Sequence, residues 1–325
     1  MEIGGYFEIE YSNIHAGSLH PNAIKLNTGR NCLEYILSVN DYKKIYIPYY
    51  ICEAVLEPVK KLDIAYEFYA ISSLLEPVAI PVMGPGEAFL YVNYFGLKSA
   101  YIQENFESSS VNVIIDNSQA LFSSPVKNVN CFYSLRKFAG VADGAFLYSE
   151  KKKDHSIFAA ADSESRSSHL YIRKEYGAQQ GYNAFVENEK KLTGLPIQTM
   201  SESTIAFTKN YDFDKNKSIR ETNFFYLYTL LKDINALPID IKNNTGPLCF
   251  PFLPLKRNIK LKQLLIKEKI YVPTFWPKVN EWLPLSESFE MDLLNNLLCL
   301  PIDQRYSIKN MDFIVKKILQ FYGEN

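Results

Sequence analysis

The feature that most constrains this 325-residue chain is an alternation of short apolar runs with amphipathic runs through its first half. Leu33, Ile36 and Leu37 show the helical spacing of such an amphipathic run. Strands that alternate with helices form a mostly parallel sheet with helices on both faces. The pattern therefore predicts an α/β fold, with strands at residues 24–28, 44–48, 64–69, 88–92 and 111–115.

The last third of the chain predicts a second, smaller unit. A long helical pattern over residues 219–234 is followed by strand patterns at 247–254 and 270–273, and by helical patterns at 261–268 and 308–322. We therefore expect a large domain over residues 1–215, which includes the N-terminal segment, and a small C-terminal α/β domain over residues 216–325. The charge run at residues 151–154 is interpreted as the solvated start of a helix.

Two polar residues follow buried-strand patterns close to each other in sequence. Asp116 ends the run 111–116, and Lys137 comes shortly after the apolar run 130–133. Ligands of parallel sheets bind at the carboxyl ends of strands, where we also expect Thr28, Pro48 and Asn93. A carboxylate there can keep a pyridine nitrogen protonated, and a lysine can hold an aldehyde as a Schiff base. The pair therefore predicts a pyridoxal 5'-phosphate site.

Composition excludes several other classes. A formal net charge of -1 provides no overall basic field for nucleic acid or an anionic membrane. No stretch resembles a signal peptide or a membrane span, so we expect a soluble cytoplasmic protein with no membrane partner. Five isolated cysteines and four scattered histidines, including His20, favour structural roles over a disulfide framework or a metal site.

Six segments, taken in order, resemble the DegT/DnrJ/StrS-type sugar aminotransferases, which depend on pyridoxal phosphate and have the type I fold of aspartate aminotransferase. The chain would be an atypical, shorter member. The matching segments are LNTGRNCLEYIL (26–37), IYIPYYICEAV (45–55), YVNYFGLKSAY (91–101), IIDNSQALF (114–122), CFYSLRKFAGVADGAFLYS (131–149) and LCLPIDQRYSIKNMDFIVKKI (298–318). They extend over nearly the whole chain, and their order is more specific than any one of them.

The resemblance implies roles for four of these residues. Lys137 would carry the cofactor, the alternative being a surface lysine. Asp116 would form a salt bridge with the ring nitrogen of the cofactor, the alternative being an aspartate that ends its strand and caps the next turn. Ser134 would contact the phosphate, the alternative being a serine that caps its own turn. Gln119 would reach the cofactor near its phenolic oxygen, the alternative being an ordinary polar loop residue.

The backbone amides at the start of the first helix are a second predicted contact with the phosphate. Gly29, Arg30 and Asn31 lie where that helix begins, and the positive end of its dipole favours an anion. The family usually has a small hydroxyl residue at the position of Arg30. Its guanidinium could bind phosphate or be an exposed side chain at the helix start.

The substrate-facing positions depart further from the family pattern. Cys52 occupies the position from which the family stacks an aromatic ring on the cofactor, so Tyr49 or, preferentially, Tyr50 would supply that ring, with core packing as the alternative. Residues 181–204 lack the asparagine-tyrosine-arginine segment that in the family enters the partner subunit's site. The sequence therefore does not identify the substrate or any residue that one subunit of a dimer would contribute to the site of the other.

These observations lead to a functional prediction. We expect a homodimeric aminotransferase that moves an amino group, with glutamate as donor, to a keto-sugar linked to a nucleotide, in the biosynthesis of amino sugars and surface polysaccharides. Two alternatives are a dehydratase of the same fold, disfavoured because its lysine position carries another residue, and a non-catalytic relative that binds a sugar nucleotide or a partner protein.

Overall fold

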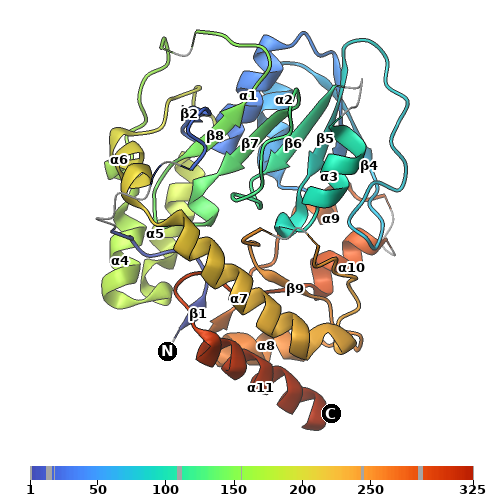
Figure 1. The fold of residues 1–325 in the computed structure, drawn as a ribbon, viewed down its shortest axis with the longest axis vertical. Coiled ribbons are helices and arrows are strands. Elements are labelled where there is room, and N and C mark those ends of the chain that lie inside the picture. Colours follow the sequence, from blue (N-terminus) through green and yellow to red (C-terminus); the bar gives the residue numbers. More distant parts are fainter. Residues whose placement is uncertain are drawn as a thin grey trace.

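The computed structural model describes residues 2–11, 17, 19–107, 112–154, 156–242, 245–284 and 288–324 (Figure 1). Its centre is a seven-stranded sheet with the strand order β2-β8-β7-β6-β5-β3-β4. All neighbouring strands from β4 to β7 are parallel, while β8 is antiparallel to both of its neighbours. The predicted mostly parallel sheet is confirmed. Its strands are β2 (Ile24–Leu26), β3 (Lys44–Pro48), β4 (Ala65–Tyr69), β5 (Glu87–Val92), β6 (Val113–Asn117), β7 (Asn130–Ser134) and β8 (Ala145–Tyr148).

Two small sheets complete the strands of the described residues. β1 (Ile3–Gly4) pairs in parallel with β10 (Ile270–Tyr271), and β9 (Phe250–Phe252) pairs antiparallel with β11 (Leu298–Leu300). The α-helices are α1 (Gly29–Val39), α2 (Leu56–Lys61), α3 (Ser99–Phe106), α4 (Ser168–Tyr176), α5 (Ala178–Lys191), α6 (Glu202–Asn210), α7 (Phe213–Leu231), α8 (Ile259–Lys267), α9 (Val279–Trp282), α10 (Phe289–Asn296) and α11 (Ile308–Glu324). Short 3-10 turns are η1 (Glu53–Val55), η2 (Tyr94–Gly96), η3 (Leu135–Lys137), η4 (Glu164–Arg166) and η5 (Lys232–Ile234).

The central strands are buried on both faces. Ile114 and Ile115 are consecutive in β6 and therefore point to opposite sides of the sheet, yet neither is exposed. Strands of this kind are near-continuous apolar runs, which is why the sequence predicted them well. Val111, the first residue of one predicted run, lies outside the described residues.

The two faces of the sheet carry different helices. Burial and the nearby Asp116 carboxylate raise the pKa of the Cys32 thiol in α1, so Asp116 lies on the side of α1. Asn117 accepts a hydrogen bond from Asn93, which also contacts Ser99 at the start of α3. Successive residues of a strand point to opposite faces. Helices α1 and α3 therefore cover opposite faces, as expected for a parallel sheet.

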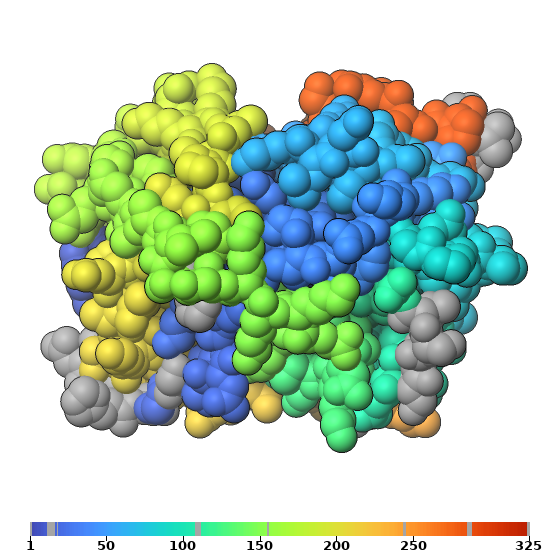
Figure 2. Space-filling model, turned by 90° about the horizontal axis from the view of Figure 1, so that it is seen from above, coloured from blue at the N-terminus to red at the C-terminus, as the bar shows by residue number. Residues whose placement is uncertain are grey.

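The C-terminal elements gather beside one end of the large sheet. Helices α7, α8 and α11 lie together below it in Figure 1, and α7 packs on both α11 and β9. Seen from above, the orange segment that contains α9 lies against the blue segment that contains β4 (Figure 2). Trp282 of α9 accounts for this contact, because its ring stacks on Phe68 and its Nε1 donates to the carbonyl of Tyr49. A domain boundary at residue 215 stays a prediction.

One local prediction is wrong. Residues 151–154 form no helix. The hydroxyl of Tyr35 accepts a hydrogen bond from the Lys153 amide at 2.6 Å and lies 2.8 Å from the Lys153 carbonyl, so these backbone groups are paired with a side chain of α1. The amide and carbonyl of Lys153 are thus paired with a buried tyrosine and are not available for the hydrogen bonds of a helix.

No helix among the described residues is both long and apolar enough to cross a membrane. The same residues contain no group of three or more histidine, cysteine, aspartate or glutamate side chains placed to hold a metal ion. His15 and His155 lie outside the described residues.

His20 has a structural environment. Its Nε2 donates to the carbonyl of Leu121 at 2.8 Å, its Nδ1 lies 3.2 Å from the Tyr148 hydroxyl, and its ring packs on Tyr133. Burial lowers the pKa of His20 to about 4, because the charged imidazole would lose its hydration. The neutral tautomer with hydrogen on Nε2 satisfies both partners.

We expect this histidine to make the protein sensitive to acid. A histidine whose folded pKa is lowered stabilises the fold above its unfolded pKa, and this stability is lost as the pH falls from about 6.5 toward 4. At pH 5 the loss is about 2 kcal/mol relative to neutral pH. In urea titrations His20→Gln, which keeps a donor for Leu121, should show a pH dependence that is shallower by up to one proton over this window. An unchanged slope would contradict the assignment.

Candidate active site

The two residues at the centre of the predicted site lie together. Asp116 is in β6 and Lys137 ends the turn that follows β7, the neighbouring parallel strand. Burial raises the pKa of Asp116, and the positive charge of Lys137 and hydrogen bonds from Ser118 oppose that rise. Asp116 is 7% exposed, whereas Lys137 is half-buried. The pair therefore combines a buried carboxyl group with an amine that is partly accessible.

The start of α1 borders the same space. A Cβ placed on Gly29 would lie 3.4 Å from Oγ of Ser118 and 3.5 Å from the ring of Phe132. Phe132 is the register partner of Asp116. The helix start, Ser118 and Phe132 thus line the face of the sheet on which Asp116 lies.

Of the three residues predicted at the start of α1, Asn31 already uses its backbone amide and its side chain in hydrogen bonds within the protein. The Asn31 amide donates to Oγ1 of Thr28, which caps the helix. The Asn31 side chain bonds the Pro196 carbonyl and the Gln198 amide. Since the first-turn amides of a helix have no partner within the helix, those of Gly29 and Arg30 are the groups best placed to receive an anion.

The Arg30 side chain is engaged with carboxylates. Its Nε lies 3.2 Å from Oε2 of Glu57, and it also helps to lower the pKa of Glu189, whose main ion-pair partner is Arg136. The second oxygen of Glu57 accepts the amide of Gly194. Arg30 therefore joins α1 to α2 by an ion pair, although its Nε makes no hydrogen bond within the described part of the chain.

Ser134 lies on the appropriate side of β7. It follows Phe132 by two residues, so both side chains project from the face that carries Asp116. Its backbone is extended, and it immediately precedes the turn that ends in Lys137. The phosphate contact of Ser134 stays a prediction.

The side-chain amide of Gln119 has an unpaired donor. Its Oε1 accepts the Phe95 amide at 3.0 Å, while its Nε2 is buried and has no hydrogen-bond partner among the residues that the structure describes. A buried amide donor left unpaired is costly and usually marks a missing partner. A ring oxygen of the predicted cofactor would supply one.

The aromatic candidates are used in packing. Tyr50 is 1% exposed, and its ring contacts those of Trp276 and Tyr94. Tyr49 stacks on Phe68. These contacts match the alternative of core packing. Cys52, in the same segment, lies near Lys137. Burial raises the pKa of the Cys52 thiol, and the charge of Lys137 opposes this rise, so the thiol is neutral.

Sequence reasoning missed three residues that border the site: Ser118, Phe132 and Cys52 as a lining residue. The alternation of side chains along β7 would have placed Phe132 with Ser134. The Asp116-Asn117-Ser118 sequence is typical of a turn in which the aspartate accepts the amide two residues on, and that bond measures 2.7 Å here.

The atypical segment at residues 181–204 has a structural anchor. Asp143, fully buried, accepts the amide and hydroxyl of Ser201 at 2.8 and 2.7 Å and also the hydroxyl of Thr204. This carboxylate thereby holds the first turn of α6 against the connection between η3 and β8, residues 138–144, which we call the Lys137 loop. Part of the segment thus stabilises the fold of this chain.

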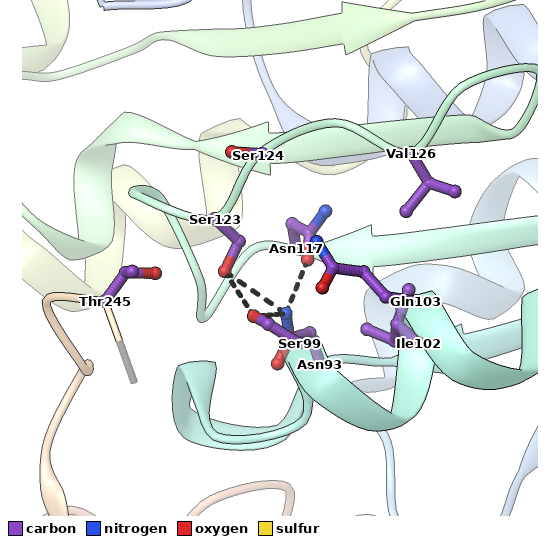
Figure 3. A pocket seen from close by; sticks show the side chains of 9 residues that line it. All are labelled: Asn93, Ser99, Ile102, Gln103, Asn117, Ser123, Ser124, Val126 and Thr245. Atoms are coloured by element: carbon purple, nitrogen blue, oxygen red, sulfur yellow. Dashed lines mark hydrogen bonds between the residues drawn. The ribbon is translucent and has the colours of Figure 1, made fainter. Parts of the chain in front are cut away.

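A small polar cavity of about 200 Å³ lies on the opposite face of the sheet (Figure 3). The side chain of Asn93 bonds Asn117, Ser99 and Ser123 there. Neither Asp116 nor Lys137 lines this cavity. Asn93, predicted at a ligand-binding strand end, is thus part of a network behind the site.

Comparisons with known proteins support the fold. No family model and no curated protein matches the sequence. The structure resembles that of Streptomyces venezuelae DesV, solved with a ketimine intermediate, with a TM-score of 0.65 and 14% identity over 92% of this chain and 84% of that one. It is also similar to a DegT DnrJ EryC1 StrS aminotransferase from Brucella abortus, with a TM-score of 0.61 and 13% identity over 93% and 86% of the chains.

A third similar structure is the Escherichia coli GDP-4-keto-6-deoxy-D-mannose-3-dehydratase with bound hydrated PLP, with a TM-score of 0.63 and 12% identity over 91% and 87% of the chains. At these identities the likeness establishes a shared fold. The structures with this fold include sugar aminotransferases and a dehydratase. The fold implied by the sequence resemblance is therefore confirmed.

Proposed function

We propose that this protein is a pyridoxal-phosphate-dependent aminotransferase that acts on a keto-sugar. The observation that carries the proposal is the buried carboxylate of Asp116 within the electrostatic reach of Lys137, at the carboxyl ends of two neighbouring parallel strands. Solved structures with this fold include sugar aminotransferases, some of them in PLP or PMP forms. The proposed substrate class follows from these neighbours.

The described residues fit the cofactor. When bound, pyridoxal phosphate supplies an aldehyde that exchanges amino groups and a ring that accepts electrons. The amides of Gly29 and Arg30 and the hydroxyl of Ser134 would bind the phosphate, and Nε2 of Gln119 would donate to the ring oxygen. The Asp116 carboxylate would accept a hydrogen bond from the protonated ring nitrogen. This charged partner would replace the hydration that the carboxylate loses on burial.

Lys137 would have a second task. As a free amine, its Nζ would take a proton from the substrate carbon as a general base and would later release that proton as a general acid. The Phe132 and Cys52 side chains would limit water at this place. Glutamate as donor, a nucleotide on the sugar, a homodimer, a cytoplasmic location and a role in polysaccharide biosynthesis are further parts of this proposal.

Half-reaction kinetics test the proposed reaction. Protein loaded with pyridoxal phosphate and mixed with glutamate should form 2-oxoglutarate in an amount equal to the sites present, before any sugar is added. A keto-sugar nucleotide should then gain an amino group. A sugar that loses water without gaining nitrogen would favour the dehydratase alternative, and sugar-nucleotide binding without cofactor would favour the non-catalytic one.

The unpaired amide of Gln119 provides a sharper test of the cofactor's orientation. Gln119→Glu keeps an oxygen for the Phe95 amide and removes the Nε2 donor. We expect the affinity for pyridoxal phosphate to fall by about tenfold or more, because a buried donor is replaced by an acceptor. Equilibrium dialysis measures it, with Gln103→Glu on the exposed side of α3 as the matched control. Equal affinities for the two variants would exclude the contact.

A further inference from the structure

Three parts of the chain that are distant in sequence meet at the short segment that follows Lys137. The Phe138 carbonyl receives hydrogen bonds from Gln304 Nε2 at 2.8 Å and from Arg220 Nη2 at 3.4 Å. The Gly140 amide donates to Oε2 of Glu10 at 2.7 Å. These three partners come from the loop after β11, from α7 and from the N-terminal segment.

The partners also hold one another. Arg220 Nε donates to Oε1 of Gln304 at 3.2 Å, and Gln304 Nε2 lies 2.9 Å from the Tyr211 hydroxyl and 3.2 Å from Oε1 of Glu10. The guanidinium of Arg220 stacks 4.7 Å from the centre of the Phe138 ring. We name Glu10, Tyr211, Arg220 and Gln304 the lysine-loop clamp.

Arg220 joins this clamp to the C-terminal elements. It is 1% exposed, and its Nη1 lies 3.2 Å from both the Pro247 and the Leu248 carbonyls just before β9. A fully buried arginine that binds backbone carbonyls on two sides has little freedom, since the planar fork fixes all of its donors. The clamp therefore connects the segments next to β9 and β11 to the Lys137 loop by hydrogen bonds, so their position restrains that loop.

The backbone at Gly140 shows how closely the parts fit. A Cβ there would come 1.8 Å from the Glu8 carbonyl oxygen and 2.9 Å from the Glu10 amide. Only glycine lets the N-terminal segment pass this close to the loop. The loop is thus enclosed on the N-terminal side as well as by α7.

We propose that Arg220 and Gln304 are positioning residues that hold the Lys137 loop through the Phe138 carbonyl and so place Nζ of Lys137 for attachment of the cofactor. Neither residue touches the proposed cofactor or substrate. The part of this inference that concerns attachment rests on the proposed function. The part that concerns the loop holds for the protein without cofactor.

Gln304→Met tests the clamp, with Gln263→Met on the exposed face of α8 as the control. In cofactor-free protein, hydrogen exchange of the amides at residues 138–141 should accelerate by about tenfold in the Gln304 variant, which is the effect of one lost hydrogen bond. Attachment of pyridoxal phosphate, trapped by borohydride reduction, should slow by a similar factor. Binding of pyridoxamine phosphate, which needs no lysine, should change less than twofold.

The outcomes separate the two proposals. Exchange and attachment rates equal to those of the Gln263 variant would overturn the clamp. Wild-type protein that takes up no pyridoxal phosphate would contradict the proposed function, while the exchange measurement would still decide on the clamp. Arg220→Lys should give the same loop effect as Gln304→Met; because Arg220 is fully buried, the Gln304 variant decides if the Arg220 variant does not fold.

Discussion

Lys137→Ala should abolish covalent attachment of pyridoxal phosphate and lower the turnover of the amino-transfer reaction by at least about a thousandfold. The lysine is proposed both to carry the cofactor and to move a proton, and loss of a positioned acid or base alone typically costs about a hundredfold to ten-thousandfold. Absorbance in the near-visible region reports attachment, and single-turnover kinetics report the rate. The variant should still bind the phosphate and ring through the other residues.

The matched control is Lys127→Ala, which removes an exposed lysine from the loop before β7. This control should keep the absorbance band and the activity of the wild type. A Lys137→Ala variant that retained both would remove Lys137 from the site. A colourless wild type that does not respond to added pyridoxal phosphate would contradict the cofactor itself.

Asp116→Asn should reduce turnover by about a hundredfold to a thousandfold and at the same time stabilise the cofactor-free protein at neutral pH. Loss of a preorganised charge in a buried site has kinetic effects of this size. Burial raises the pKa of Asp116, and an acid with a raised folded pKa contributes stability at low pH that is lost as the pH rises through that pKa. Asparagine removes the buried charge and still offers an oxygen to the Ser118 amide.

Thermal unfolding of the cofactor-free proteins and steady-state kinetics of the loaded ones measure the two effects. Asp292→Asn is the control, since Asp292 forms a partly exposed ion pair with Arg257 and does not belong to the proposed site. It should leave turnover unchanged and lower stability only slightly. An Asp116→Asn variant with lower stability and normal turnover would show that the carboxylate is structural.

The fold could be predicted from the sequence because its signals are local. The strand over residues 44–48 was predicted with the observed bounds. The strand that contains Asp116 begins two residues after its predicted start, and the last helix begins at Ile308 as predicted. Buried parallel strands are continuous apolar runs, and the alternation of strand and helix limits the possible topologies. The helix start predicted at residues 151–154 was wrong because Tyr35, more than a hundred residues away in sequence, forms hydrogen bonds with the backbone there.

The candidate site was predictable only in part for the same reason. Asp116 lies near the carboxyl end of one strand and Lys137 shortly after the neighbouring strand, so topology alone brings them together. The pairing of Arg30 with Glu57 and the packing of Tyr50 against Trp276 depend on side chains whose partners no local pattern identifies. The clamp on Phe138 joins residues that are 82 and 166 positions away from it.

Reduction of the loaded protein with borohydride, followed by peptide mapping, tests the central claim most directly. The reaction fixes the cofactor to the amine that holds it. The account predicts a phosphopyridoxyl group on the peptide that contains Lys137, at about one per chain, with no comparable label on other lysines. A protein that carries no label, or one labelled on a different lysine, would contradict it.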